Sequence, residues 1–491
     1  MNNLESINVI IIIVSVLMFI CVFATKFLTK FGVPILILFI GVGMLMGSEG
    51  IIGVYFDNPS LTREIGNLAL CIIIFSGGLD LSWRHAKQVL VSSVILSTIG
   101  VLLTAVFVGL FTHLVFGMPL LYAFLLGAIV SSTDAASVFA ILRAQKMKTK
   151  GKVTQLLEFE SGSNDPMAYI LTITIIGLII NPQEGISGFI LNFIQQFGLG
   201  MIWGIIFGFA TVQILNRIHH NIDSMYLILG IILMLFAYSV SSIIGGNSFL
   251  TVYIAGIIIG NSSFVRKTRV IRFFDGLSWL AQIILFITLG LQVFPSRLLD
   301  ISIQALIISL VLIFIIRPLV VLPVLSLFKM PFKQSVFVSF VGFRGAASIV
   351  FATYPLTAGL SHSQEIFDIV FFIALSSLII QGLAMKPVAK HLGIIEDNVD
   401  SFQMQNFSHY VDEISDMPLL AVYVSNYSPI VGKTVRELEL PEEIRIVTIR
   451  QNEGYTTPKG NTIIREGDRM LITCLSEDDM KDICQRLKLE Y

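Results

Sequence analysis

The stretch EFESGSNDPMAYILTIT, Glu158 to Thr174, poses the question on which the fold depends. Its leading half carries carboxylates at Glu160 and Asp165, and its trailing half continues, with no break beyond Pro166, into the apolar run YILTITIIGLII. A charged side chain in the middle of a bilayer costs at least about 2.5 to 3.5 kcal/mol. The two carboxylates therefore need partners or a function, and the stretch predicts a membrane-spanning helix with a polar centre.

The composition of the whole chain is that of a polytopic membrane protein. Of its 491 residues, 55% are hydrophobic and 13% are charged, and the mean hydropathy is +0.84, whereas soluble domains average about 25% charged residues. The net charge of -1 does not indicate a nucleic-acid partner. The four cysteines form no CxxC pair and no cluster with histidine, so we expect neither a zinc centre nor a disulfide framework.

Apolar segments of spanning length fill the first 391 residues. Thirteen of them can be placed, centred near residues 17, 42, 72, 101, 129, 170, 202, 233, 254, 284, 313, 346 and 378. The first follows a leader whose only charge is Glu5, so we expect a retained span and not a signal peptide. Residues 1–391 are therefore predicted to form a transmembrane domain of about 13 α-helices.

Basic residues are distributed unequally between alternate loops of this domain. One set of loops carries 18 Lys and Arg residues, whereas the other set carries only Arg63 and Arg297. Loops rich in Lys and Arg stay in the cytoplasm. We therefore expect a multi-pass protein of the cell membrane with its N-terminus outside and its tail in the cytoplasm.

The tail differs from the membrane part in composition. Residues 392–416 are acidic and contain no Lys or Arg, which predicts a linker. Beyond them, LLAVYVS, IRIVTIRQ and RMLITC alternate as short strands do, and TVRELEL and SEDDMKDICQRL have helical character. Residues 417–491 therefore predict a small α+β domain. The Gly432-Lys433 pair lacks the rest of a phosphate-binding loop and is interpreted as a turn into a helix.

An internal repeat relates the two halves of the membrane domain. Asp134 opens DAASVFA and Gly345 opens GAASIVFA, a separation of 211 residues. Glycines match at separations of 213 and 212 residues, as Gly43 with Gly256 and Gly78 with Gly290. The offset spans seven segments, an odd number, so the two halves must have opposite orientations in the membrane. This is the inverted-repeat arrangement of secondary transporters.

The repeated strings also predict the position of the site. In inverted-repeat transporters, the substrate binds near the midplane, where paired helices are interrupted. The strings SSTDAAS and FRGAAS place Asp134 and Arg344 beside small residues in the middle of two spans, and we predict that these spans are the interrupted pair. Tight helix packing through small residues is the alternative explanation, but it does not account for the two charges.

With the loop ends excluded, the charged residues inside the predicted spans are Asp134, Glu160, Asp165, Arg317 and Arg344. A buried arginine stays protonated and needs a carboxylate, so we expect an ion pair between Glu160 and Arg344. No partner can be assigned to Arg317. On a helix, Glu160 and Asp165 point in directions about 140° apart, so Asp165 can face a cavity while Glu160 faces its partner.

Asp165 then remains as the carboxylate without a basic partner. Oxygen ligands are available around it from the hydroxyls of Ser161 and Thr133 and from the side chain of Asn164. Hard cations take oxygen ligands, and one carboxylate suits a single positive charge. A cation and a proton neutralise the same carboxylate, so the two compete for it. Competition at a site exposed alternately to either side of a membrane is coupled exchange; a satisfied polar cluster without a transport role is the alternative.

Three motifs in order, SSTDAASV, ESGSNDP and GFRGAAS, resemble those of the cation:proton antiporter-1 family, the NhaP-type monovalent cation/proton exchangers. The resemblance covers the membrane part and implies a NhaA/NhaP-like fold and a homodimer in which a six-helix core moves against a fixed scaffold. It implies a structural ion pair of Glu160 with Arg344. It also implies ion- or proton-binding roles for Asp165, Asn164, Ser161, Thr133 and Asp134, with the Asn-Asp pair typical of electroneutral exchangers.

The tail resembles an RCK C-terminal (TrkA-C) domain through SPIVGKTVRELELP and IIREGDRMLITC. Such domains are similar to regulators of potassium transport and pair as dimers. The resemblance therefore favours K+ as the transported cation, with Na+ kept open, and it suggests cyclic di-AMP as a ligand of the tail. We expect no bound cofactor and no metal beyond the transported cation.

The predicted function is secondary active exchange of one monovalent cation, K+ or Na+, for one proton, regulated by the tail; no enzyme activity is expected. Two other classes remain. A ligand-gated cation channel would explain a regulatory tail, but a carbonyl filter such as TVGYG is absent from the sequence. A membrane sensor without transport would leave the inverted repeat and its charges unexplained.

Overall fold

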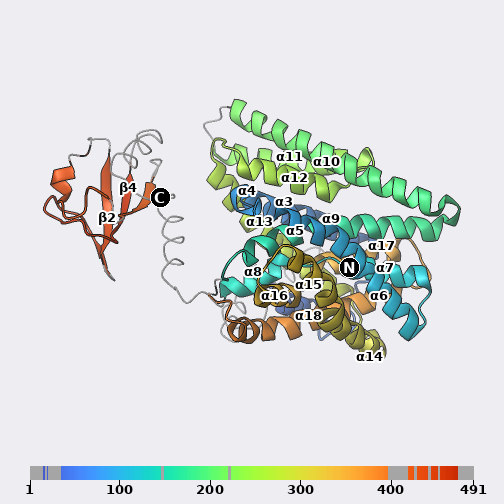
Figure 1. The fold of residues 1–491 in the computed structure, drawn as a ribbon. Coiled ribbons are helices and arrows are strands. Elements are labelled where there is room, and N and C mark those ends of the chain that lie inside the picture. The colour runs from blue at the N-terminus through green and yellow to red at the C-terminus, as the bar shows by residue number, and fades with distance from the viewer. Residues whose placement is uncertain are drawn as a thin grey trace. The chain divides into compact units, whose positions relative to one another are not determined.

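The computed structural model describes residues 15, 16, 19, 35–144, 147, 149–218, 223–395, 419–424, 428–438, 440, 444–451 and 454–473. The chain divides into two compact units, Met1–Glu396 and Asp397–Tyr491 (Figure 1). The expected first span lies outside the described residues except for residues 15, 16 and 19. The linker beyond residue 395 and the helical segment SEDDMKDICQRL also lie outside them.

The first unit is built from apolar helices. Within the described part of the chain, eight helical segments are long and apolar enough to cross a membrane: Pro59–Asp80 (α3), Leu90–Phe116 (α5, π-helix η1 and α6), Val153–Ile180 (α9), Ser187–Arg217 (within α10, Gly185–Arg217), Ser224–Ile243 (within α11, Asp223–Ile243), Lys267–Gln292 (α13), Pro295–Leu327 (α14, π-helix η3 and α15) and Ser363–His391 (α18). Shorter helices are Ile35–Met46 (α2), Trp83–Ala86 (α4), Leu120–Val130 (α7), Ala135–Ala144 (α8), Ser248–Asn261 (α12), Phe332–Phe340 (α16) and Ala346–Thr357 (α17). The polytopic helical fold is confirmed, and each segment expected between residues 42 and 378 coincides with a helix. The count of 13 stays a prediction.

The internal repeat is visible at two helix crossings. Gly43 of α2 faces Gly290 of α13, where a Cβ on Gly43 would lie 2.9 Å from the Gly290 Cα. Gly256 of α12 faces Gly78 of α3, where a Cβ on Gly256 would lie 3.2 Å from the Gly78 Cα. Such close backbone approach requires glycine. The sequence repeat matches Gly43 with Gly256 and Gly290 with Gly78. The crossing of α2 with α13 therefore corresponds, in the other half of the repeat, to the crossing of α12 with α3.

Two spans are interrupted where the repeated strings predicted it. Residues 131–134 separate α7 from α8, and residues 341–345 separate α16 from α17. The two non-helical segments meet, because the backbone N–H of Asp134 donates a hydrogen bond of 2.8 Å to the carbonyl of Phe343. The prediction of an interrupted pair is confirmed.

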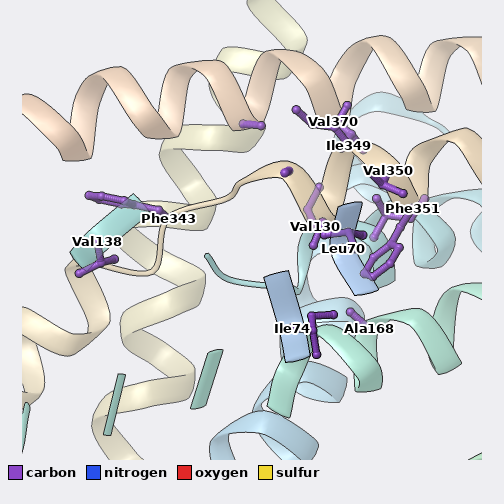
Figure 2. Close-up of a cluster of buried hydrophobic side chains, with 14 of the residues drawn as sticks. Leu70, Ile74, Val130, Val138, Ala168, Phe343, Ile349, Val350, Phe351 and Val370 are labelled. Carbon is purple, nitrogen blue, oxygen red and sulfur yellow. The ribbon is translucent and has the colours of Figure 1, made fainter. Parts of the chain in front are cut away.

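The helices of the first unit form two groups (Figure 1). The helices α2, α3 and α10–α13 pack against one another and are called the α3 bundle; α5–α9 and α14–α18 form the α9 bundle. Apolar side chains join the two bundles. Leu70 and Ile74 of α3 belong to one buried cluster with Val350 and Phe351 of α17 (Figure 2).

The second unit contains a four-stranded antiparallel sheet in the order β1-β4-β2-β3. Its strands are Leu419–Tyr423 (β1), Arg445–Gln451 (β2), Gly454–Thr456 (β3) and Arg469–Thr473 (β4). The three expected strands are confirmed, and β3 was not expected. Among the described residues of TVRELEL, Val435–Leu438 form the short 3-10 helix η4. Gly432 lies in the turn before it with φ of 85°, as the interpretation of the Gly-Lys pair required.

Candidate functional site

An acidic cavity of about 590 Å³ lies between the two bundles. The α3 bundle lines it with α3 and α13, and the α9 bundle lines it with α8, α9 and the first interrupted segment. None of its described lining residues is Lys or Arg, and five are acidic: Asp80, Asp134, Glu158, Asp165 and Asp275. A cleft lined by one sign of charge concentrates ions of the opposite sign. The cavity is therefore suited to a cation.

Asp165 lies at the inner end of this cavity, where a second, smaller cavity of about 30 Å³ begins. Asp134 lines both cavities, and the first residues of α17, Ala346 and Ala347, line the small one. The hydroxyl of Ser132 donates a hydrogen bond to Asp165 Oδ1. The small cavity is large enough for a water molecule, and so for a ligand of similar size.

Thr133 connects the first interrupted segment to α9. Its carbonyl accepts a hydrogen bond of 2.5 Å from the Ser161 hydroxyl, and its own hydroxyl accepts one of 2.5 Å from Asn164 Nδ2. Its backbone N–H donates to Asn164 Oδ1 at 3.4 Å. Ser161 lines the acidic cavity, whereas Thr133 and Asn164 are buried and are not among its lining residues. These bonds place Asp165 beside the interruption.

Asp134 lies at the beginning of two helices. It caps α8, because its Oδ1 accepts from the Ser137 N–H at 3.2 Å and its Oδ2 accepts from the Ser137 hydroxyl at 2.5 Å. A Cβ on Gly345 would clash with Asp134 Oδ2, so the carboxylate also lies against the residue that precedes α17. Helix N-termini attract negative charge. Two of them converge on this side chain.

Glu160 pairs with Arg317 and not with Arg344. Arg317 Nη2 lies 2.6 Å from Glu160 Oε1, and both side chains are buried. A Cβ on Gly342 would lie 2.7 Å from Arg317 Nε, so the absence of a side chain at residue 342 lets the guanidinium reach Glu160. The expected Glu160–Arg344 ion pair is therefore wrong. Glu160 pairs with Arg317 because the Arg317 side chain passes Gly342 of the second interrupted segment. The spacing of residues in the sequence does not reveal this contact.

Arg344 instead holds the interrupted segments together. Its Nη1 donates a hydrogen bond of 2.8 Å to the carbonyl of Ser132, and its backbone N–H donates one of 3.0 Å to the Ser377 hydroxyl. The side chain is fully buried. Ser132 follows the C-terminal end of α7, where a positive charge is favoured by the helix dipole. Ser132 thus links Arg344 to Asp165, because its carbonyl accepts from Arg344 and its hydroxyl donates to Asp165.

Sequence reasoning missed several residues of this region. Ser132 could have been found from its place in SSTDAAS, directly before Thr133. Ser377 of α18 binds Arg344 of the second interrupted segment, and Gln381 of α18 donates a hydrogen bond to the carbonyl of Phe340, the last residue of α16. Their spacing in an apolar helix carries no distinctive signal. Asp368 of α18 is a further buried carboxylate, and it is not among the lining residues of either cavity.

The chain is similar to known membrane transporters along most of its length. Residues 13–391 match the family described as sodium/hydrogen exchanger, transmembrane, and residues 419–488 match the TrkA-C domain. The K(+)/H(+) antiporter NhaP of Alkalimonas amylolytica is 34% identical over 478 residues, covering 97% of this chain and 83% of that protein. The K(+)/H(+) antiporter NhaP2 of Shewanella sp. strain ANA-3 is 32% identical over 471 residues, covering 95% of this chain and 81% of that protein.

More distant matches have 24% identity with this chain. The Na(+)/H(+) antiporter ApNhaP of Aphanothece halophytica is 24% identical over 432 residues, covering 85% of this chain and 80% of that protein. The structure of the sodium proton antiporter MjNhaP1 from Methanocaldococcus jannaschii superposes with a TM-score of 0.67 at 24% identity, covering 78% of this chain and 99% of that chain. The superposition shows a common fold.

Proposed function

Because the chain belongs to the sodium/hydrogen exchanger family, we propose that it exchanges one K+ for one proton at Asp165. The observation that carries the proposal is the position of this carboxylate, at the inner end of an acidic cavity and beside the meeting point of two interrupted spans. A cation or a proton can neutralise it, but not both at once. Ser161, on the same cavity wall, supplies a hydroxyl oxygen, and Asn164 and Thr133 hold the interrupted segment in place.

The proposed ratio of one to one follows from the buried charges. The charge of Glu160 is balanced by Arg317 at 2.6 Å. Asp134 is bonded to Ser137 at the start of α8 and lies against the start of α17, an environment that favours its negative charge. Asp165 is then the group that changes its ligand during the cycle. Exchange of one proton for one monovalent cation moves no net charge.

Potassium is the proposed cation on two grounds. Two relatives above 30% identity are named K(+)/H(+) antiporters, and the tail is a TrkA-C domain, for which the sequence resemblance implies potassium-linked regulation. Sodium is the second candidate, since ApNhaP is named for it. We also propose a homodimer whose tail regulates exchange; cyclic di-AMP stays the ligand expected from the resemblance.

The acidic cavity is proposed to face the cytoplasm. Three of its carboxylates lie toward one end of the membrane domain: Asp80 ends α3, Glu158 follows the start of α9, and Asp275 lies near the start of α13. The neighbouring loops belong to the basic set, which the charge distribution places inside the cell. The structure then corresponds to the state in which Asp165 exchanges ligands with the cytoplasm.

In vesicles that contain the purified protein, K+ is expected to dequench a pH-sensitive dye more strongly than Na+ does. A channel would instead pass an electrical current, and a sensor would give no response. Since one-to-one exchange moves no net charge, the exchange rate should not depend on the membrane potential. A current on a solid-supported membrane that scales with the exchange rate would contradict the one-to-one ratio.

Ser132→Ala is expected to raise the apparent KM for the cation about ten- to a hundredfold, the effect of losing one hydrogen bond to a charged group. The hydroxyl of Ser132 donates to Asp165 and positions its carboxylate. Ser131→Ala is the matched control, because the Ser131 hydroxyl donates to the carbonyl of Ala128 at 2.6 Å within its own helix end. Dye dequenching over a range of cation concentrations measures both variants, and an equal KM in the two would contradict the assigned role.

A further inference from the structure

Polar side chains connect α3 and α17 at the end of the molecule opposite to the acidic cavity. Arg63 Nη1 donates a hydrogen bond of 2.8 Å to Thr357 Oγ1, and the Tyr354 hydroxyl donates one of 2.7 Å to Asn67 Oδ1. The Arg63 guanidinium also lies 5.6 Å from the centroid of the Tyr354 ring, within the range of a cation–π contact. Because α3 and α17 belong to different bundles, these contacts hold the two bundles together.

The contacts continue along both helices toward Asp165. The spacing of three and four residues places one set of α3 side chains on a single face of that helix, namely Arg63, Gly66, Asn67, Leu70 and Ile73. Leu70 and Ile73 line the small cavity at Asp165. The corresponding face of α17 carries Thr357, Tyr354, Val350 and Ala347, the last of which lines the same cavity. The seam between α3 and α17 therefore runs from Asp165 to the opposite end of the bundle.

The seam is closed in this structure. A Cβ on Gly66 would lie 2.7 Å from Val350 Cγ2, so the backbone of α3 lies directly against the Val350 side chain. Leu70 is 2% exposed and Val350 is 0% exposed. Both belong to the buried apolar cluster drawn in Figure 2. An ion at Asp165 thus meets a packed apolar layer and, beyond it, the two hydrogen bonds.

We propose that this seam is the gate on the side of the membrane opposite to the acidic cavity. It consists of the Gly66–Val350 contact, the Asn67–Tyr354 bond and the Arg63–Thr357 bond. The inference rests on the proposed function, because an exchanger that is open on one side must be closed on the other. Access from the opposite side requires α3 and α17 to separate, which breaks both hydrogen bonds and opens the apolar layer.

A disulfide across the seam tests the gate. An ideal Cβ on Gly66 would lie 3.4 Å from the Val350 Cβ, close to the separation of about 3.5 to 4.5 Å in disulfides. In a chain whose native cysteines are replaced by serine, Gly66→Cys with Val350→Cys should lose dye dequenching in proportion to the cross-linked fraction and regain it on reduction. Gly66→Cys with Val350→Ala, which relieves the same contact and cannot be bridged, should not respond to oxidant.

The results of the cross-linking experiment distinguish a failure of the proposed gate from a failure of the proposed antiport function. Exchange that continues in the fully cross-linked protein would overturn the gate while leaving antiport intact. Absence of exchange in the reduced protein and in the wild type alike would instead overturn the proposed function. Thiol titration under denaturing conditions measures the cross-linked fraction in each sample.

A second experiment weakens the gate without a cross-link. Leu70→Cys serves as a reporter beside the small cavity, and an impermeant thiol reagent is added on the side of the membrane opposite to the tail. Tyr354→Phe should raise the labelling rate about two- to tenfold, as expected for one lost hydrogen bond. Tyr122→Phe is the matched control, because the Tyr122 hydroxyl bonds to Ser361 Oγ at 2.9 Å within the α9 bundle. Equal labelling rates in the two variants would overturn the role of Tyr354.

Discussion

Asp165→Asn is expected to reduce exchange below about 1% of the wild-type rate, because an amide neither takes up a proton nor neutralises a bound cation. The substitution keeps the size of the side chain, and the Ser132 hydroxyl can still donate to its oxygen. The protein should therefore remain folded. Dye dequenching with K+ and with Na+ measures the loss, and size-exclusion chromatography of the detergent-solubilised protein checks that folding and assembly are retained.

Asp368→Asn is the matched control for this variant. Asp368 is also a buried carboxylate, 4% exposed, but it accepts its hydrogen bond from Gln364 on the same helix and is not among the lining residues of the two cavities. Its substitution should leave most of the exchange rate. If Asp165→Asn retained more than a few per cent of the rate, or if both variants lost exchange equally, the assignment of the site to Asp165 would be wrong.

Breaking the Glu160–Arg317 pair is expected to lower the free energy of unfolding by about 3 to 5 kcal/mol from either side, because each single change strands a buried charge. Glu160→Gln and Arg317→Met remove one charge each. The double variant should lose clearly less than the sum of the two, since it leaves neither charge unpaired. Thermal unfolding in detergent, followed for the four members of the cycle, gives the coupling between the residues.

The same cycle with Arg344→Met in place of Arg317→Met compares the observed pair with the one that residue types alone suggested. Arg344 donates to the Ser132 carbonyl and makes no ion pair with Glu160 in the part of the chain that the structure describes. Its coupling to Glu160 should therefore be the smaller of the two. A larger coupling of Glu160 to Arg344 than to Arg317 would show that the pairing differs in the membrane.

The sequence by itself determined the architecture of the membrane unit. Apolar length places spans along the chain, and a recurring offset of 211 to 213 residues relates the two halves. Both signals follow from local chemistry, because every span must be apolar and of bilayer length. The interruptions at SSTDAAS and FRGAAS were also predictable, since charges among small residues in mid-span are costly unless the backbone there has polar partners.

The sequence also singled out most of the polar residues at the interruption. The spacing of Ser161 and Asp165 puts both on one side of α9, and the structure places both in the wall of the acidic cavity. Spacing along one helix is a local property, so it survives folding unchanged. The same reasoning could not rank Ser132 above Thr133, because both are hydroxyl residues in an irregular segment whose side-chain directions are not periodic.

Only the tertiary structure decided which residues meet across helices. Glu160 reaches Arg317 because Gly342, on a third segment, leaves room for the guanidinium. Asn67 meets Tyr354 across 287 positions of sequence, and nothing in either local pattern marks the contact. Such pairings depend on how whole helices cross and on which positions lack a side chain at the crossing. These are collective properties of packing, and no single stretch of the chain contains them.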